Sequence, residues 1–235
     1  MRARWYVWAA SIFAVCLVAL FPLRVAIGAA TGPESLLTAR QVAGTVWSGR
    51  VGEMMAGPER LGTFDVALNP LTLPLGRFEV AIERLDDPEG PLTGVLALGG
   101  ASEGVKDLNG RMTLSRLLSP LPSGAMRFED VRMLFKGGRC REAAGSVQLQ
   151  ASLGIAGLSR DMSGPVSCRE DGRGMAELKG PRGAERLTII VDAEGGYEAD
   201  LAIEGAPPIL RDALSRAGFA EEGTSVVLRQ SGRLR

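Results

Sequence analysis

Alternation of apolar and polar residues runs through most of this chain and limits what it can fold into. Between residues 76 and 83, Phe78, Val80 and Ile82 alternate with mostly charged residues, and in residues 145–153 apolar residues alternate with serine and glutamine. A period of two residues is typical of a β-strand with one buried face. The chain is therefore predicted to be mostly β.

The alternation predicts about a dozen short strands joined by turns rich in glycine, proline and aspartate. They cover residues 41–47, 50–55, 61–68, 76–83, 92–98, 105–114, 126–135, 145–153, 162–168, 175–178, 186–191, 197–203 and 224–229. We place a turn at Ser48-Gly49, a tight turn or bulge at Asn109-Gly110 and a phase slip at Glu129-Asp130. One short C-terminal helix is predicted from Pro207 to Gly218.

Strands with one apolar face pair most simply as an antiparallel sheet that is open to water on its other side. A sheet of this size has to curl, split or close. We therefore predict a long curved antiparallel sheet, with the form of an open groove or half-barrel.

The N-terminus is a second constraint. Residues 5–21 carry no charge and follow Arg2 and Arg4. A helix rises about 1.5 Å per residue, and crossing a bilayer takes roughly 17–25 residues. Arg24 can extend to the membrane interface, so that Val25 to Ala30 lengthen the span.

This pattern divides the chain into three parts. Residues 1–30 are predicted to be a single transmembrane anchor in the inner membrane, with a cytoplasmic N-terminus because positive charge stays on that side. Residues 31–40 form a linker, and residues 41–235 form a periplasmic β-rich domain. The alternative is a cleaved signal peptide with its site at Ala26-Ile27-Gly28 or Gly28-Ala29-Ala30, but the apolar run is longer than the usual 7–15 residues or so.

The cysteines agree with export. Cys16 lies in the apolar run, which leaves Cys140 and Cys168 in the predicted periplasmic domain. Two cysteines in an oxidising compartment are more often a disulfide than two thiols. Two thiols without histidine are too few ligands for a metal site.

The composition argues against an enzyme. The chain has no histidine, which excludes Ser-His-Asp and Cys-His mechanisms. Its 27 basic residues balance 27 acidic ones without a basic patch, so no nucleic-acid partner is expected. We expect no cofactor and no catalytic or metal site.

The segment Gly44-Thr45-Val46-Trp47-Ser48-Gly49 stands out, because it holds the only tryptophan after residue 8. One interpretation is a core residue between two glycine bends. The other is a contact site for a lipid or a protein partner. Phe64 and Phe78 are candidate contacts of the same kind.

This segment, soon after an apolar N-terminus, resembles the start of the type II secretion system protein N (GspN) family. Leu68-Asn69-Pro70-Leu71 before Leu75-Gly76 is similar to that family's W-x-L-x-P…L-x-G segment, although Phe64 or Val66 stands where a tryptophan is usual. Gly137-Gly138-Arg139-Cys140…Gly145 is similar to its G-x-C…G segment. Pro207 to Leu214 and the late strand are similar to its C-terminal end.

The resemblance implies an accessory, non-enzymatic component of the type II secretion apparatus. Such a protein is anchored in the inner membrane and has a periplasmic domain that contacts other secretion proteins. The resemblance also implies the wider AsmA-like group, whose curved sheets form grooves for lipid chains. The alternative function is therefore a periplasmic lipid-binding or lipid-handling protein. An envelope hydrolase is a third hypothesis, for which the sequence displays no serine or carboxylate site.

Overall fold

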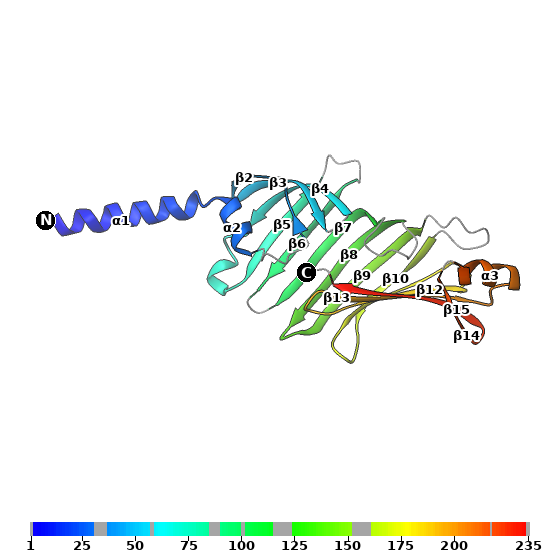
Figure 1. Ribbon diagram of the computed structural model, residues 1–235. Helices are drawn as coiled ribbons and strands as arrows, with labels where there is room; N and C mark the ends of the chain where they lie inside the picture. Colours follow the sequence, from blue (N-terminus) through cyan, green and yellow to red (C-terminus); the bar gives the residue numbers. More distant parts are fainter. Residues whose placement is uncertain are drawn as a thin grey trace.

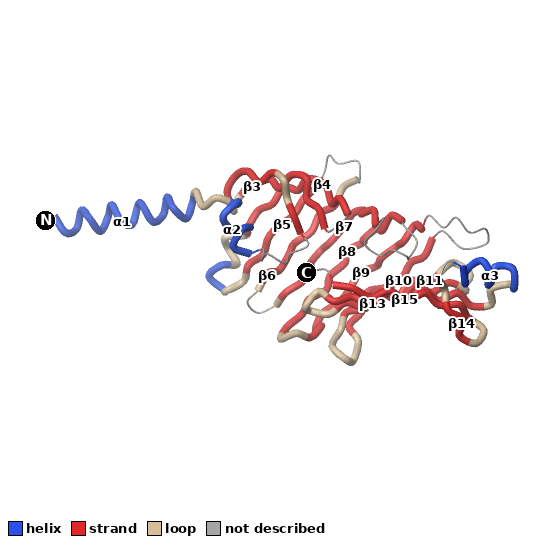
Figure 2. Tube along the Cα trace, in the orientation of Figure 1, coloured by secondary structure: helices blue, strands red, loops and turns tan. Residues whose placement is uncertain are grey.

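A computed structural model describes residues 2–30, 37–56, 59–84, 90–99, 102–114, 124–151, 161–216 and 218–233. Within these residues, fifteen strands form one sheet in which every pairing is antiparallel (Figures 1 and 2). The strands are β1 (Leu37–Thr38), β2 (Gln41–Thr45), β3 (Ser48–Ala56), β4 (Glu59–Leu68), β5 (Phe78–Arg84), β6 (Leu92–Leu98), β7 (Glu103–Leu114), β8 (Gly124–Lys136), β9 (Arg139–Ala151), β10 (Asp161–Cys168), β11 (Gly174–Lys179), β12 (Glu185–Val191), β13 (Gly196–Glu204), β14 (Ala220–Glu222) and β15 (Ser225–Arg233).

The order of the strands in the sheet follows the chain. From β3 to β13 each strand pairs with the next, after which β15 pairs with β13, and β14 lies at the far edge. At the near edge, β1 and β2 pair with successive parts of the same side of β3. The predicted open antiparallel sheet is therefore confirmed.

Most predicted strands are present, and the differences are local. The turn between the first two strands consists of Val46 and Trp47, so its placement at Ser48-Gly49 was wrong by two residues. The sequence also missed β1, β14 and a 3-10 turn at Leu73–Leu75. The predicted linker lies partly outside the described residues, at 31–36.

Three bulges distort the middle and the start of the sheet. Glu53, Asp107 and Asp130 each have a φ of 49° at a register shift in β3, β7 and β8. Bulges bend a strand and increase its twist. The register also shifts between Leu108 and Gly110 on β7 and between Glu129 and Arg132 on β8, so the irregularities predicted at Asn109-Gly110 and Glu129-Asp130 are confirmed. Figure 1 shows β12 to β15 turning across the sheet instead of continuing its plane.

Two apolar clusters form the core. The C-terminal core gathers buried side chains from β8 to β13, β15 and the helix α3 (Pro208–Arg216), with Leu178, Leu201 and Leu214 among them. The N-terminal core gathers side chains of the first strands, including Val51 and Phe64. Leu108 and Phe128 pack against both clusters, so the two clusters adjoin each other in the middle of the sheet. The predicted C-terminal helix is confirmed as α3.

The N-terminal segment differs from the prediction. It forms two helices, α1 (Arg2–Ala19) and α2 (Leu23–Ala30), which are separated at Pro22 (Figure 2). Proline has no amide hydrogen and its ring clashes with the preceding turn, so a helix breaks there. Among the described residues, no helix combines the length and the apolarity needed to cross a membrane. The expectation that residues 25–30 lengthen a span was wrong, because Ala26 and Ile27 pack against the N-terminal core.

Candidate functional site: the junction between the N-terminal helix and the sheet

The turn between β2 and β3 holds the end of α1. The indole Nε1 of Trp47 donates a hydrogen bond to the carbonyl oxygen of Val18 at 3.0 Å, and the amide of Phe21 donates to the same oxygen at 3.2 Å. In a continuous helix that oxygen would accept from residue 22, which is proline. Trp47 therefore pairs a carbonyl that the helix break leaves without its usual donor.

Backbone contacts fix the connection between α1 and α2 to the same turn. The amide of Val46 donates to the carbonyl of Phe21 at 3.1 Å, and Pro22 forms an isolated β-bridge with Thr45. Leu23, the first residue of α2, is buried in the N-terminal core. The start of α2 is thus part of the folded sheet domain.

The two glycines of the segment 44–49 face each other across this hairpin. Gly44 has a φ of +88°, which residues with a side chain rarely adopt. A Cβ on Gly44 would also lie 2.6 Å from the carbonyl oxygen of Ser48. A Cβ on Gly49 would lie 2.5 Å from a methyl group of Leu23. Both glycines are needed for the hairpin and α2 to approach.

Helix α1 projects away from the sheet (Figure 1). Its large apolar side chains are exposed, and they are Trp5, Tyr6, Val7, Trp8, Ile12, Phe13, Val15, Leu17 and Val18. An exposed apolar surface of this size is typical of a site that contacts a membrane or another protein.

An apolar pocket of about 570 Å³ lies where α1 meets the sheet. It is lined by Ala14, Val15, Val18, Ala19, Trp47 and Pro70. Trp47 thus contributes both a hydrogen bond to α1 and an apolar wall beside it. We define this pocket, with the turn Val46–Trp47, as the α1 junction.

The other two aromatic candidates lie in different surroundings. Phe64 is only 5 % exposed in the N-terminal core, with the guanidinium of Arg84 5.5 Å from its ring centroid. Phe78, at the start of β5, is 49 % exposed and pairs with Leu98 of β6. The structure brings Trp47 and Phe78 to the same end of the sheet and places Phe64 inside the core.

Sequence reasoning missed Arg84, which is 1 % exposed. Its guanidinium donates to the carbonyls of Gly90, Leu61 and Arg111. A buried charge is tolerated when its donors are paired in this way. Arg84 therefore ties β4, β5 and β7 together at the end of the sheet opposite the α1 junction.

Cys140 and Cys168 form a disulfide, as the sequence predicted, with 5.5 Å between their Cα atoms. The bond joins β9 and β10 beyond the last residue pair of their ladder, Ser146 and Pro165. Cys16, in α1, is a free thiol.

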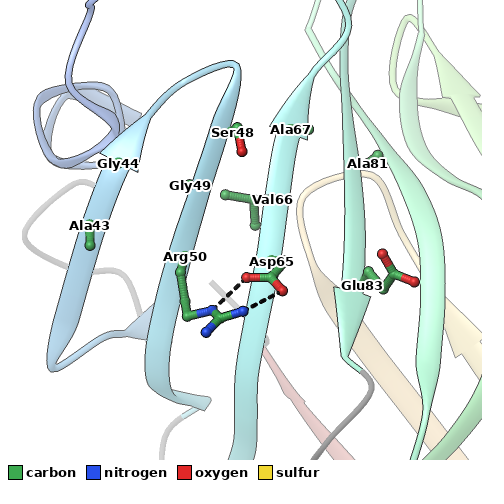
Figure 3. A pocket seen from close by; sticks show the side chains of 10 residues that line it. All are labelled: Ala43, Gly44, Ser48, Gly49, Arg50, Asp65, Val66, Ala67, Ala81 and Glu83. Atoms are coloured by element: carbon green, nitrogen blue, oxygen red, sulfur yellow. Dashed lines mark hydrogen bonds and ion pairs between the residues drawn. The ribbon is translucent and has the colours of Figure 1, made fainter.

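A shallow depression of about 430 Å³ crosses β2 to β5 (Figure 3). In it Arg50 and Asp65, which are opposite each other on β3 and β4, make two hydrogen bonds of 2.6 and 2.8 Å. The hydrogen bond from Arg50 lowers the pKa of Asp65 below its usual value of 3.8. Exposed pairs of this kind contribute little to stability, and the depression is otherwise lined mainly by glycine and alanine.

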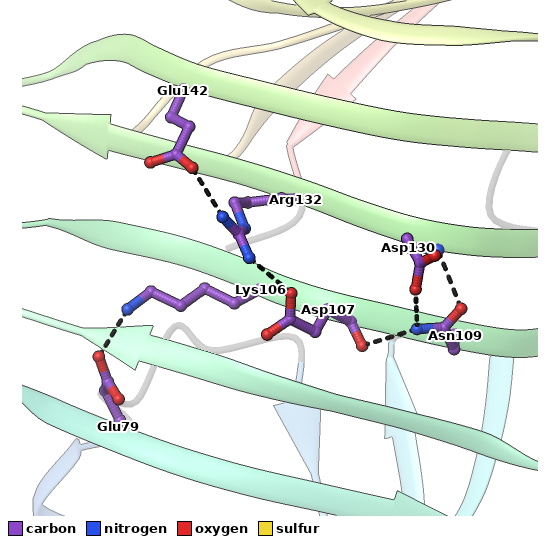
Figure 4. A network of polar contacts seen from close by, with 7 residues as sticks. All are labelled: Glu79, Lys106, Asp107, Asn109, Asp130, Arg132 and Glu142. Atoms are coloured by element: carbon purple, nitrogen blue, oxygen red, sulfur yellow. Dashed lines mark hydrogen bonds and ion pairs between the residues drawn. The ribbon is translucent and has the colours of Figure 1, made fainter.

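A polar network holds the bulged strands (Figure 4). Asn109 accepts from the amide of Asp130 at 2.9 Å and donates to its carboxylate at 2.9 Å. Arg132 pairs with Asp107 at 2.7 Å and with Glu142 at 2.9 Å, and these contacts raise the pKa of Arg132. The groups satisfy one another, which is the arrangement of a structural network.

The described residues hold no group of three or more His, Cys, Asp or Glu side chains placed for a metal ion. The features that remain as a functional candidate are therefore the exposed helix α1 and its junction.

A family model matches most of the chain. The family described as type II secretion system (T2SS), protein N, matches residues 35–229, which include the segment 44–49, the disulfide and nearly all of the sheet. Comparison with curated proteins and with solved structures yields no match. The chain belongs to the type II secretion system protein N family.

Proposed function

We propose that this chain is a non-enzymatic accessory component of the type II secretion apparatus, attached to the inner membrane through α1. The sheet lies in the periplasm, where it contacts other secretion proteins. The family match over residues 35–229 carries the proposal. The exposed apolar surface of α1 and the disulfide, which suits an oxidising compartment, support the attachment and the location.

With α1 attached to the membrane and the sheet in the periplasm, the α1 junction would lie at the periplasmic surface of the membrane. There the contacts of Trp47 hold the sheet close to the membrane, within reach of other membrane-bound components.

Deleting the gene and comparing the secreted proteins tests the proposal. We expect reduced secretion, restored by the wild-type chain. Unchanged secretion in a strain with the other components present would contradict it. Photocrosslinking from Phe78, with Ile209 of α3 as a control at the opposite end of the sheet, then identifies the protein partners on each end.

Lipid binding is the second candidate function, and the apolar pocket of the α1 junction favours it. At about 570 Å³ it has room for part of an acyl chain, and each buried methylene would contribute roughly 0.8 kcal/mol. Mass spectrometry of lipids that copurify with the protein tests this. A protein free of lipid after gentle extraction would argue against it.

A further inference from the structure

The exposed apolar side chains of the sheet domain gather at one end. After α2, the large apolar side chains that are exposed in the described residues are Leu71, Leu75, Phe78, Leu98 and Ile209. All but Ile209 lie at the end of the sheet that carries the α1 junction. A soluble face exposes such residues singly, so their grouping beside α1 calls for a partner.

The strand pairing explains the grouping. β3 begins and β4 ends beside the turn Val46–Trp47, because Gly49 pairs with Val66. The loop Asn69–Arg77 follows at the same end, and Phe78 pairs with Leu98 directly beyond it.

The loop Asn69–Arg77 is held in one conformation by its own hydrogen bonds. The side chain of Asn69 accepts from the amide of Leu71 at 3.0 Å, and the hydroxyl of Thr72 donates to the carbonyl of Asn69 at 3.0 Å. Gly76, with a φ of 67°, closes the 3-10 turn. The loop thus presents Leu71, which is 82 % exposed, and Leu75 to the outside in a fixed way.

Charge and continuity indicate the kind of partner. The loop contains no acidic residue, and its one charged residue is the exposed Arg77. Pro70 lines the apolar pocket together with Trp47 and α1. The exposed loop is therefore adjacent in space to the helix that we propose to lie in the membrane. Leucines beside an arginine and a tryptophan fit the interface of an anionic bilayer.

We propose that the loop Asn69–Arg77, together with Phe78 and Leu98, is a second membrane contact that seats this end of the sheet on the periplasmic surface of the bilayer. The inference rests on the proposed attachment through α1. Two contacts, α1 and the loop, would fix the direction in which the sheet extends from the membrane, which a single contact would leave open.

Fluorescent labelling of single thiols tests this contact. The full chain is reconstituted into vesicles of phosphatidylcholine and phosphatidylglycerol, with an environment-sensitive fluorophore at one cysteine. Cys16 is labelled in the wild-type chain, and Leu71→Cys, Leu75→Cys and Ile209→Cys are made in a Cys16→Ser background. Ile209 is the matched control, because it is an equally exposed apolar residue, at 87 %, on the opposite end.

We expect spin-labelled lipids to quench the labels at positions 16, 71 and 75 several-fold more than the label at 209. If position 16 is quenched while 71 and 75 behave like 209, the loop contact is wrong and the attachment through α1 stands. If position 16 is not quenched, both proposals fail. A loop that instead binds a protein partner would also leave positions 71 and 75 behaving like 209 while position 16 is quenched, because the vesicles contain this chain alone.

Discussion

The indole nitrogen of Trp47 lies 3.0 Å from the carbonyl oxygen of Val18. In a continuous helix this oxygen would accept a hydrogen bond from residue 22, but Pro22 has no amide hydrogen to donate. The proline ends α1, and the tryptophan from the β2–β3 turn pairs the carbonyl that results. The tryptophan of the segment 44–49 therefore has two roles, because it also packs, partly buried, against the N-terminal core. It joins the projecting helix to the sheet.

Replacing Trp47 with phenylalanine keeps the ring but removes the donor. A hydrogen bond of this kind contributes about 0.5–1.5 kcal/mol, so we expect the amide of Val46, which bonds to Phe21 in the same junction, to exchange its hydrogen roughly 2- to 10-fold faster. Hydrogen exchange of the full chain in lipid nanodiscs measures this. The control is Trp8→Phe, on the exposed part of α1, and equal exchange in the two variants would show that the indole bond does not hold the junction.

Phe64 and Phe78 both fall on the apolar positions of their alternating strands, but they should respond differently to truncation. Phe64→Ala removes a buried ring from the N-terminal core and should lower the free energy of unfolding by about 3–5 kcal/mol. Phe78→Ala, at a half-exposed position, should cost less than about 1 kcal/mol. Denaturant unfolding compares the two variants, and similar losses would mean that Phe64 is not enclosed in the N-terminal core.

The disulfide should contribute measurably to stability. The loop between Cys140 and Cys168 spans a sequence separation of 28, for which the loop-entropy model gives about 3–4 kcal/mol. The double substitution Cys140→Ser with Cys168→Ser should lower the unfolding free energy by about that amount. Under non-reducing conditions only Cys16 should react with a thiol reagent in the denatured wild-type chain, and three reactive thiols would exclude the bond.

Acid should weaken the sheet through its paired carboxylates. Hydrogen bonds from Arg50 to Asp65 and from Arg229 to Glu222 lower the pKa of each carboxyl group below its usual value of 3.8 or 4.5. A lowered pKa in the folded state gives stability that is present above the unfolded pKa and is lost as the pH falls through the folded one. The unfolding free energy should thus decrease below about pH 4.5. Asp65→Asn should make that decrease shallower, whereas an unchanged slope would show that the Arg50 pair is not maintained in solution.

The sequence predicted the strands well where the pattern is local and long. The predicted and observed bounds of β6 coincide at residues 92–98, because a run of seven residues is long enough to show a preference for strand structure. It missed β1 and β14, of two and three residues, which are too short to display a period of two. It also predicted the wrong turn residues, since Val46 and Trp47 are not typical of turns and their position depends on contacts with Phe21 and Val18.

The candidate site was predictable only in part. The composition of the segment 44–49 pointed to Trp47. Its partner is a backbone carbonyl, however, and every residue has one, so the sequence does not indicate which carbonyl is bound. The same reason hides Arg84, whose acceptors are carbonyls from three separate segments. Alternation alone could not separate the buried Phe64 from the exposed Phe78, because burial at a strand's first residue depends on where its neighbours end.

Gly49 provides the sharpest test of how the segment 44–49 works. A Cβ added there would lie 2.5 Å from a methyl group of Leu23 and 2.8 Å from the carbonyl oxygen of Thr45. The methyl group of Leu23 has little room to move because Leu23 is buried, and the backbone of the hairpin cannot give way, so Gly49→Ala should loosen both the hairpin and its contact with α2 and lower the unfolding free energy by about 1–3 kcal/mol. Gly28→Ala is the matched control, because a Cβ on Gly28 meets nothing within 4 Å and alanine favours the helix by up to about 1 kcal/mol. Thermal unfolding of both variants should therefore move in opposite directions, and a neutral Gly49→Ala would show that α2 is not packed against the hairpin.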